Sequence, residues 1–126
     1  MATIRVAHDR EHDVTLYTVA GELTPEEVIA TIERDYATNP TTHILWDLTD
    51  GSLVGMTSAA FRRIADVARE RRRPTPEGRT AYVGSDDLAY GLMRMYTTLA
   101  YFARVEADYE VFRTREEALA WLTSSR

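Results

Sequence analysis

Two hydroxyl side chains at a predicted helix start, Thr57 and Ser58, are the residues whose place in the sequence best suits regulatory chemistry. A Ser or Thr there commonly caps the helix, because its oxygen accepts a hydrogen bond from an otherwise unpaired backbone amide. The same place suits a phosphorylated side chain, since the free amides and the helix dipole both favour a dianion. We therefore keep two interpretations of this pair: a structural cap, and a phosphorylation site that switches the binding of a partner.

Carboxylates follow two strands that the sequence places near the centre of a sheet. Asp47 and Asp50 come after one strand and Asp86 after the next. Ligands of open α/β sheets commonly bind at the carboxyl ends of the strands, so these carboxylates could bind a cation or carry out acid–base chemistry. We favour a simpler interpretation, in which Asp86 caps a helix, Asp50 makes a turn with Gly51, and the other carboxylate faces water.

Two histidines, His8 and His12, stand four residues apart with acidic residues around them. On a helix this spacing could hold a metal ion. It falls in a predicted hairpin turn, where successive side chains diverge, so we predict no metal site and no cofactor. The sequence also lacks a glycine-rich phosphate loop, a Gly-x-Ser-x-Gly elbow and a His-Glu-x-x-His helix. We therefore predict a protein without enzymatic activity.

The segment at residues 88–103 predicts a helix that is apolar almost all round. One stripe consists of Leu88, Leu92, Met95, Tyr96 and Leu99, and a second side carries Tyr90, Met93, Thr97 and Tyr101. A surface helix needs only one apolar face, so the second side requires an explanation. Core packing with exposed tyrosines, a homodimer interface and a pocket for a small apolar ligand are the three that we consider.

The periodicity of apolar residues places these side chains on a fold. Strands are predicted near residues 3–7, 14–20, 44–46, 80–83 and 109–112, and helices begin near Pro25, Thr57 or Ser58, Ser85 or Asp86, and Thr114. The order β-β-α-β-α-β-α-β-α predicts one α/β domain over residues 1–126. Its sheet is mixed and parallel over most of its width, with helices packed on the sheet.

Composition narrows the class of protein. The 126 residues are 44% hydrophobic and 28% charged, as in ordinary globular domains. The absence of cysteine excludes disulfides and thiolate metal sites. A net charge of −5 does not favour nucleic acid. Arg94 interrupts the longest nearly uncharged stretch, so we predict no membrane span, and the first residues lack the apolar core of a signal peptide. We expect a cytoplasmic protein.

Two segments carry a resemblance to a known family, Trp46–Asp50 and Gly78–Ser85. With the order of elements, they make the chain similar to STAS domains, the anti-sigma-factor antagonists of bacteria and their relatives, and above all to the SpoIIAA-like branch. In the antagonists, a partner kinase phosphorylates a Ser at the start of the regulatory helix, usually within Asp-Ser-Ser-Gly. The corresponding segment Met56–Ala59 keeps the two hydroxyls and lacks the acidic residue and the glycine.

The resemblance implies a non-enzymatic regulatory domain of STAS type that binds a protein partner, such as a kinase, an anti-sigma-like factor or a second copy of itself. Phosphorylation at Thr57 or Ser58 would control it. Some SpoIIAA-like proteins are grouped with lipid-transfer domains, which implies the alternative function. In that alternative the chain carries or senses a small, lipid-like apolar ligand beside the third helix.

Overall fold

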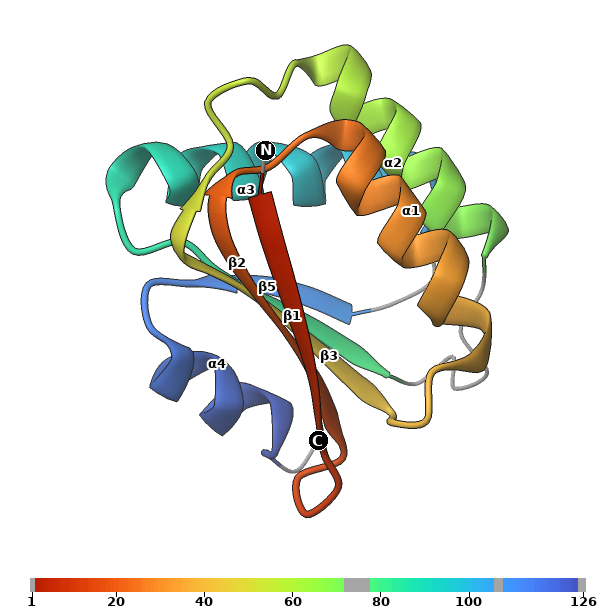
Figure 1. Cartoon of the computed structure of the whole chain (residues 1–126), viewed down its shortest axis with the longest axis vertical. Coiled ribbons are helices and arrows are strands. Elements are labelled where there is room, and N and C mark those ends of the chain that lie inside the picture. Colours follow the sequence, from red (N-terminus) through yellow and green to blue (C-terminus); the bar gives the residue numbers. More distant parts are fainter. Residues whose placement is uncertain (1, 72–77, 106–107, 125–126) are drawn as a thin grey trace.

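The protein consists of a five-stranded sheet with helices on both faces (Figure 1). Its structure is a computed structural model that describes residues 2–71, 78–105 and 108–124. In chain order the elements are β1 (Ala2–Asp9), β2 (Val14–Glu22), α1 (Pro25–Asp35), the 3₁₀ turn η1 (Tyr36–Thr38), β3 (His43–Ser52), α2 (Ser58–Glu70), β4 (Arg79–Val83), α3 (Asp87–Phe102), β5 (Asp108–Phe112) and α4 (Arg115–Leu122). The predicted order of strands and helices is confirmed. Within the described residues, every helix is too short or too polar to cross a membrane.

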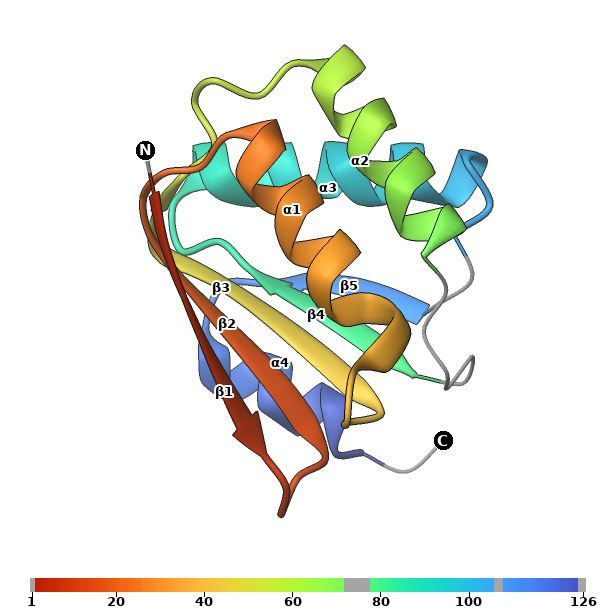
Figure 2. The same cartoon turned by 45° about the vertical axis from the view of Figure 1, so that its right-hand side comes forward.

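Neighbouring strands in the sheet are also neighbours in the sequence, in the order β1-β2-β3-β4-β5. Strand β1 pairs antiparallel with β2, and all other pairs are parallel, which confirms the mixed sheet. Helices α1, α2 and α3 cover one face, and α4 covers the other (Figure 2). The first three helices each connect two parallel strands, whereas α4 follows the last strand.

Local sequence signals fix the ends of the helices. Thr24 caps α1 by accepting a hydrogen bond from the backbone of Glu27, whose side chain in turn accepts from the Thr24 backbone, and Pro25 follows the cap. Glu27 also accepts a hydrogen bond from the Ala2 backbone amide at 3.1 Å. The capping box therefore also holds the start of β1.

The alternation of side chains along β3 separates two cores. Ile44, Trp46 and Leu48 point to the face with three helices, and Leu45 packs in the smaller core under α4. Trp46 stacks on Tyr17 with ring centroids 4.5 Å apart. Both faces of β3 are thus buried, which explains the continuous apolar run in its sequence.

Strand β3 is longer than its apolar run predicted. We expected the chain to leave the sheet after Trp46, but β3 continues to Ser52 and pairs with the end of β2. The register shifts between Thr18 and Ala20, where Leu48 and Thr49 of β3 lie opposite Val19 alone, so the extra residue is in β3. Backbone pairing with β2 explains why the polar residues that follow Trp46 stay in the sheet.

Candidate functional site

Thr57 is the N-cap of α2. Its backbone is extended, and its Oγ1 accepts a hydrogen bond from the Ala60 amide at 3.1 Å. Its carbonyl oxygen accepts from the Phe61 amide, which closes the first turn. The Thr57 side chain therefore has a structural role that is already complete.

Ser58 differs from its neighbour. It is the first residue of the 13-residue helix, it is exposed, and its hydroxyl makes no hydrogen bond with the described part of the chain. The first turn of α2 contains no acidic residue. Exposed Arg62 lies one turn later, at the i+4 spacing that brings side chains together on a helix. A negative group on Ser58 would meet backbone amides and a guanidinium.

The loop before α2 is held in place by two buried side chains. Leu53 and Met56 are each 7% exposed, and the Met56 amide donates a hydrogen bond to the Leu53 carbonyl at 2.9 Å. Between them Val54 is 63% exposed. We call the exposed residues Val54, Thr57, Ser58 and Arg62 the α2 start surface. It combines an apolar side chain, two hydroxyls and a cation on a fixed backbone.

Asp47 is buried on the α4 face of the sheet. Its carboxylate accepts hydrogen bonds from the Thr49 hydroxyl at 2.6 Å and the Thr49 amide at 2.9 Å, and from Arg115 Nε at 2.8 Å. Burial by itself would raise the pKa of Asp47, but the hydrogen bonds from Thr49 and Arg115 outweigh it and hold this pKa below its ordinary value. The ion pair joins β3 to the first turn of α4.

The structure does not bring the three predicted carboxylates together. Asp86 caps α3 by accepting a hydrogen bond from the Ala89 amide at 2.7 Å. Asp50 is exposed and lies beside Ala20 of the neighbouring strand. Asp47 is committed to Arg115 on the opposite face from α3. The predicted cap at Asp86 is confirmed, but the predicted turn at Asp50 and Gly51 is wrong because both residues lie within β3, and Asp47 is buried instead of facing water. The three positions provide no common point for a cation.

Among the residues that the structure describes, a single group of three could hold a metal ion: Asp9, Glu11 and His12, all exposed in the β1–β2 turn. His12 Nδ1 lies 2.7 Å from Asp9 Oδ2, and this hydrogen bond raises the pKa of His12. His8 instead points its Nδ1 at the Thr15 hydroxyl, 3.0 Å away. The two histidines therefore do not share a site.

Helix α3 separates the four residues that we grouped on its second side. Met93 is 3% exposed and belongs to the core, together with Ala89, Tyr96 and Ala100. Tyr101 is 71% exposed, Tyr90 packs under the guanidinium of Arg113 at 4.2 Å, and the Thr97 hydroxyl donates to the Arg94 carbonyl. The structure therefore does not place Tyr90, Met93, Thr97 and Tyr101 together on one apolar face.

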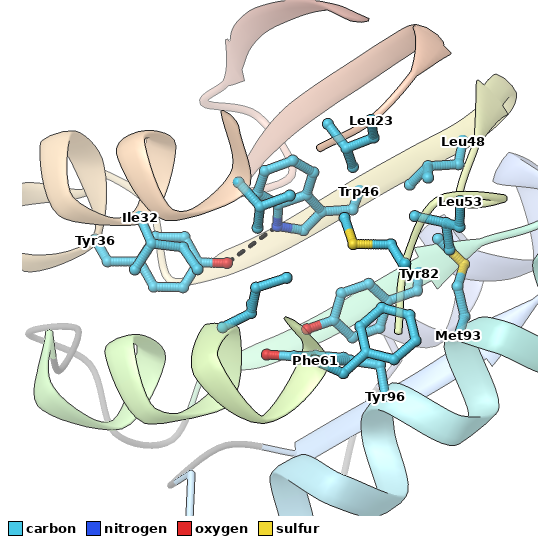
Figure 3. A pocket seen from close by; sticks show the side chains of 13 residues that line it. Leu23, Ile32, Tyr36, Trp46, Leu48, Leu53, Phe61, Tyr82, Met93 and Tyr96 are labelled. Carbon is cyan, nitrogen blue, oxygen red and sulfur yellow. Dashed lines mark hydrogen bonds between the residues drawn. The ribbon is translucent and has the colours of Figure 1, made fainter. Parts of the chain in front are cut away.

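A cavity of about 50 Å³ lies between the sheet and the three helices α1, α2 and α3. Figure 3 shows its aromatic and apolar lining, which includes Trp46, Phe61, Tyr82, Met93 and Tyr96. The rings of Phe61 and Tyr82 both meet Tyr96 edge to face, at 5.6 and 5.7 Å, and burial raises the pKa of the Tyr96 hydroxyl. An apolar cavity of roughly 150 Å³ can hold benzene, so this smaller cavity must widen to admit a ligand of that size.

A family model described as SpoIIAA-like matches residues 14–123. The chain belongs to the SpoIIAA-like family. This match confirms the resemblance predicted from residues 46–50 and 78–85. No curated protein matches the chain.

Solved structures share the fold of this SpoIIAA-like protein at low sequence identity. An anti-sigma factor antagonist from Mycobacterium paratuberculosis has a TM-score of 0.64 and 15% identity, with 98% of this chain and 96% of that chain covered. An uncharacterized protein of the DUF3478 family with a SpoIIAA-like fold, from Shewanella loihica PV-4, has a TM-score of 0.56 and 19% identity, with 96% and 93% covered. The two likenesses establish the fold.

Two features of this SpoIIAA-like protein were missed from its sequence. Arg115 lies 68 residues from Asp47, so no local spacing indicates their ion pair. The aromatic lining of the cavity comes from five separate elements: η1, β3, α2, β4 and α3. The sequence indicates that these lining residues are apolar and buried, but it does not indicate that their side chains point into one cavity.

Proposed function

We propose that this SpoIIAA-like protein is a non-enzymatic regulatory domain that binds a protein partner through the α2 start surface, and that phosphorylation of Ser58 switches this binding. The observation that carries the proposal is the exposed Ser58 hydroxyl, which is uncommitted while Thr57 supplies the cap. A modified Ser58 therefore leaves the helix start intact.

Charge gives the direction of the switch. A phosphoryl group adds about −1.5 to −2 charges at neutral pH. The free amides of the first turn and the cation of Arg62 stabilise these charges. The same charges, on a surface that also includes exposed Val54, oppose an apolar contact with a partner, because the contact would desolvate them. Unmodified protein binds the partner, and modified protein releases it.

Two partners follow from this proposal: a kinase that modifies Ser58 and an anti-sigma-like factor that docks on the α2 start surface. The fold likeness to an anti-sigma factor antagonist supports the second partner. Phosphorylation of Thr57 would modify the same oxygen that accepts the capping hydrogen bond from the Ala60 amide. Ser58 is for this reason the favoured acceptor of the pair.

The test compares partner recovery from the native host by crosslinking mass spectrometry. The double variant Thr57→Asp with Ser58→Asp is compared with Ser58→Ala and with Thr98→Asp, which changes an exposed residue of α3. We expect the double aspartate to lose crosslinks between the α2 start surface and the partner, while both other variants keep them. Equal crosslinking by all three variants would count against the proposal.

A second copy of the chain is a further candidate partner. The exposed rings of Tyr101 and Phe102, 71% and 74% exposed, lie edge to face at the end of α3. Exposed aromatic side chains favour protein contacts. Light scattering on Tyr101→Asp tests this, because an interface at this end would make the variant smaller in solution than the parent protein. An unchanged mass would remove this surface from consideration.

The interior cavity favours one alternative function, in which the protein carries or senses a small apolar ligand. The lining that includes Met93 and Tyr96 is apolar and aromatic, and methionine adapts readily to ligand shape. Met93→Trp fills this space, whereas Tyr101→Ala leaves it untouched. Loss of a co-purified lipid from the tryptophan variant alone would support the carrier. Protein from the host without any lipid would argue against it.

A further inference from the structure

Strand β1 forms a free edge of the sheet. In the described part of the chain it pairs with β2 alone, along the whole of Ala2–Asp9. Its outer side therefore carries backbone N–H and C=O groups without a strand partner. Figure 2 shows β1 along the margin of the sheet. We call this outer side the β1 edge. Such a row of groups is a template on which another strand can pair.

The β1 edge lacks the features that normally protect an edge strand from association, which include proline, lysine, a bulge and short length. It is eight residues long and contains neither proline nor lysine. Its register with β2 runs without a shift. The opposite edge strand, β5, has five residues and carries exposed Asp108 and Glu110. The β1 edge is thus the more open of the two to pairing.

One face of the β1 edge carries opposite charges around a small residue. Ile4 packs against the larger core. The alternating residues Arg5, Ala7 and Asp9 therefore lie on the other face of the strand. Arg5 is exposed and has no ion pair with a described residue. The Asp9 carboxylate accepts from the His12 backbone amide at 3.1 Å and lies 2.7 Å from His12 Nδ1, and it keeps lone pairs for another donor. A cation and an anion thus flank Ala7.

Two copies of β1 could pair antiparallel in several registers, and the charges select one of them. A two-fold axis perpendicular to the sheet keeps each face on its own side, so every residue meets a residue of the same face. An axis at Arg5 sets two arginines directly opposite each other, which is destabilising. An axis at Val6 leaves Arg5 equally near Arg5 and Asp9 of the second copy. An axis at Ala7 places Arg5 directly opposite Asp9 of the second copy, twice by symmetry, which is stabilising.

We propose that two copies of this protein associate through their β1 edges, paired antiparallel about a two-fold axis at Ala7. The pairing satisfies backbone groups of both strands and joins the two sheets into one. Each copy closes the edge of the other, so association stops at two copies. Strand pairing places Ala7 level with Leu45 of β3, whereas α2 follows the far end of that strand. The interface is therefore separate from the α2 start surface, and its failure leaves the proposed partner binding untouched.

Sedimentation equilibrium of the full chain tests the pairing. A single pair of strands is a small interface, so the dissociation constant should be on the order of 100 μM. Arg5→Glu and Asp9→Arg each create two like-charge pairs, and each should weaken association at least about tenfold. A mixture of these two variants restores opposite charges at both positions and should associate as the parent protein does. Arg69→Glu, at an exposed position of α2, is the matched control and should have no effect.

A cysteine placed at the axis tests the register, because the chain has no cysteine of its own. Ala7→Cys sets two α-carbons about 5 Å apart and should form a disulfide between copies in a glutathione buffer. Thr3→Cys, whose two α-carbons would lie roughly 25 Å apart, should not. Single copies at concentrations well above the expected constant, or a mixture that associates no more tightly than its components, would overturn the proposal. So would equal cross-linking of both cysteine variants, or loss of association through Tyr101→Asp but not through Arg5→Glu.

Discussion

Replacing Thr57 by alanine should lower the stability of the protein, whereas replacing Ser58 by alanine should leave it unchanged or raise it. Thr57→Ala removes the oxygen that accepts from the Ala60 amide at 3.1 Å, and loss of such a cap costs about 1 kcal/mol, with a range of roughly 0.5–2. For a domain of this size that corresponds to a fall in melting temperature of about 3–5 °C. Alanine cannot replace the acceptor, so the first-turn amide is left to water.

Ser58→Ala should leave the free energy of unfolding unchanged or raise it by up to about 0.5 kcal/mol, since alanine forms helix better than serine. Ser58→Asp should also be neutral or stabilising, by about 0.3–1 kcal/mol, because a negative charge in the first turn favours the helix dipole. The first turn of the parent helix has no acidic residue, so no like charge of the same turn opposes it.

Urea denaturation followed by circular dichroism measures all three variants under identical conditions. Thr57→Asp is the matched control, because aspartate is itself a good N-cap and should retain most of the stability. A loss for Ser58→Ala as large as that for Thr57→Ala would refute the assignment of separate roles. Any change in partner binding by a Ser58 variant would then be attributable to folding.

Three further predictions concern the cores on the two sides of the sheet. Arg115→Met should lower the free energy of unfolding by about 2 kcal/mol at neutral pH. Because the pKa of Asp47 is depressed in the folded state, this stabilisation is present above the unfolded pKa of about 3.9 and is lost as the pH falls through the lower folded value. Urea titrations of parent and variant should therefore converge in acid. Met93→Ala enlarges the cavity and should cost about 2–5 kcal/mol by thermal unfolding; a smaller loss would mean that the helices close over the space. Tyr36→Phe leaves the Trp46 indole N–H, now 3.0 Å from the Tyr36 hydroxyl, unpaired, and should cost about 1–3 kcal/mol by the same method; unchanged stability would indicate that another acceptor reaches the indole.

Local signals made most of the fold predictable. The capping box at Thr24 and Glu27, the hydroxyl at Thr57 and the carboxylate of Asp86 each mark a helix start in the structure. Such caps work through atoms only two or three residues apart, so the sequence contains the whole interaction. The apolar run ending at Trp46 placed the buried strand, although backbone pairing with β2 extends it.

The orientation of side chains around α3 and the pairing of residues far apart in the chain could not be predicted from the sequence. Apolar residues occupy nearly every side of α3, so periodicity could not distinguish Met93 in the core from Tyr101 in water. The small side chains of Ala89 and Ala100 mark the face that approaches the sheet, a signal that hydrophobicity alone overlooks. The placement of α4 on the opposite face, and with it the Asp47 ion pair, depends on tertiary packing.

The mass of the protein purified from its own host shows whether Ser58 is the regulated residue. Intact mass is measured in native and denaturing conditions, followed by peptide mapping. We expect an added phosphoryl group that survives denaturation and maps to Ser58 in part of the population. Ser58 without modification during growth, starvation and stress would contradict this role, and an added mass that is lost on denaturation would instead favour the carrier of an apolar ligand.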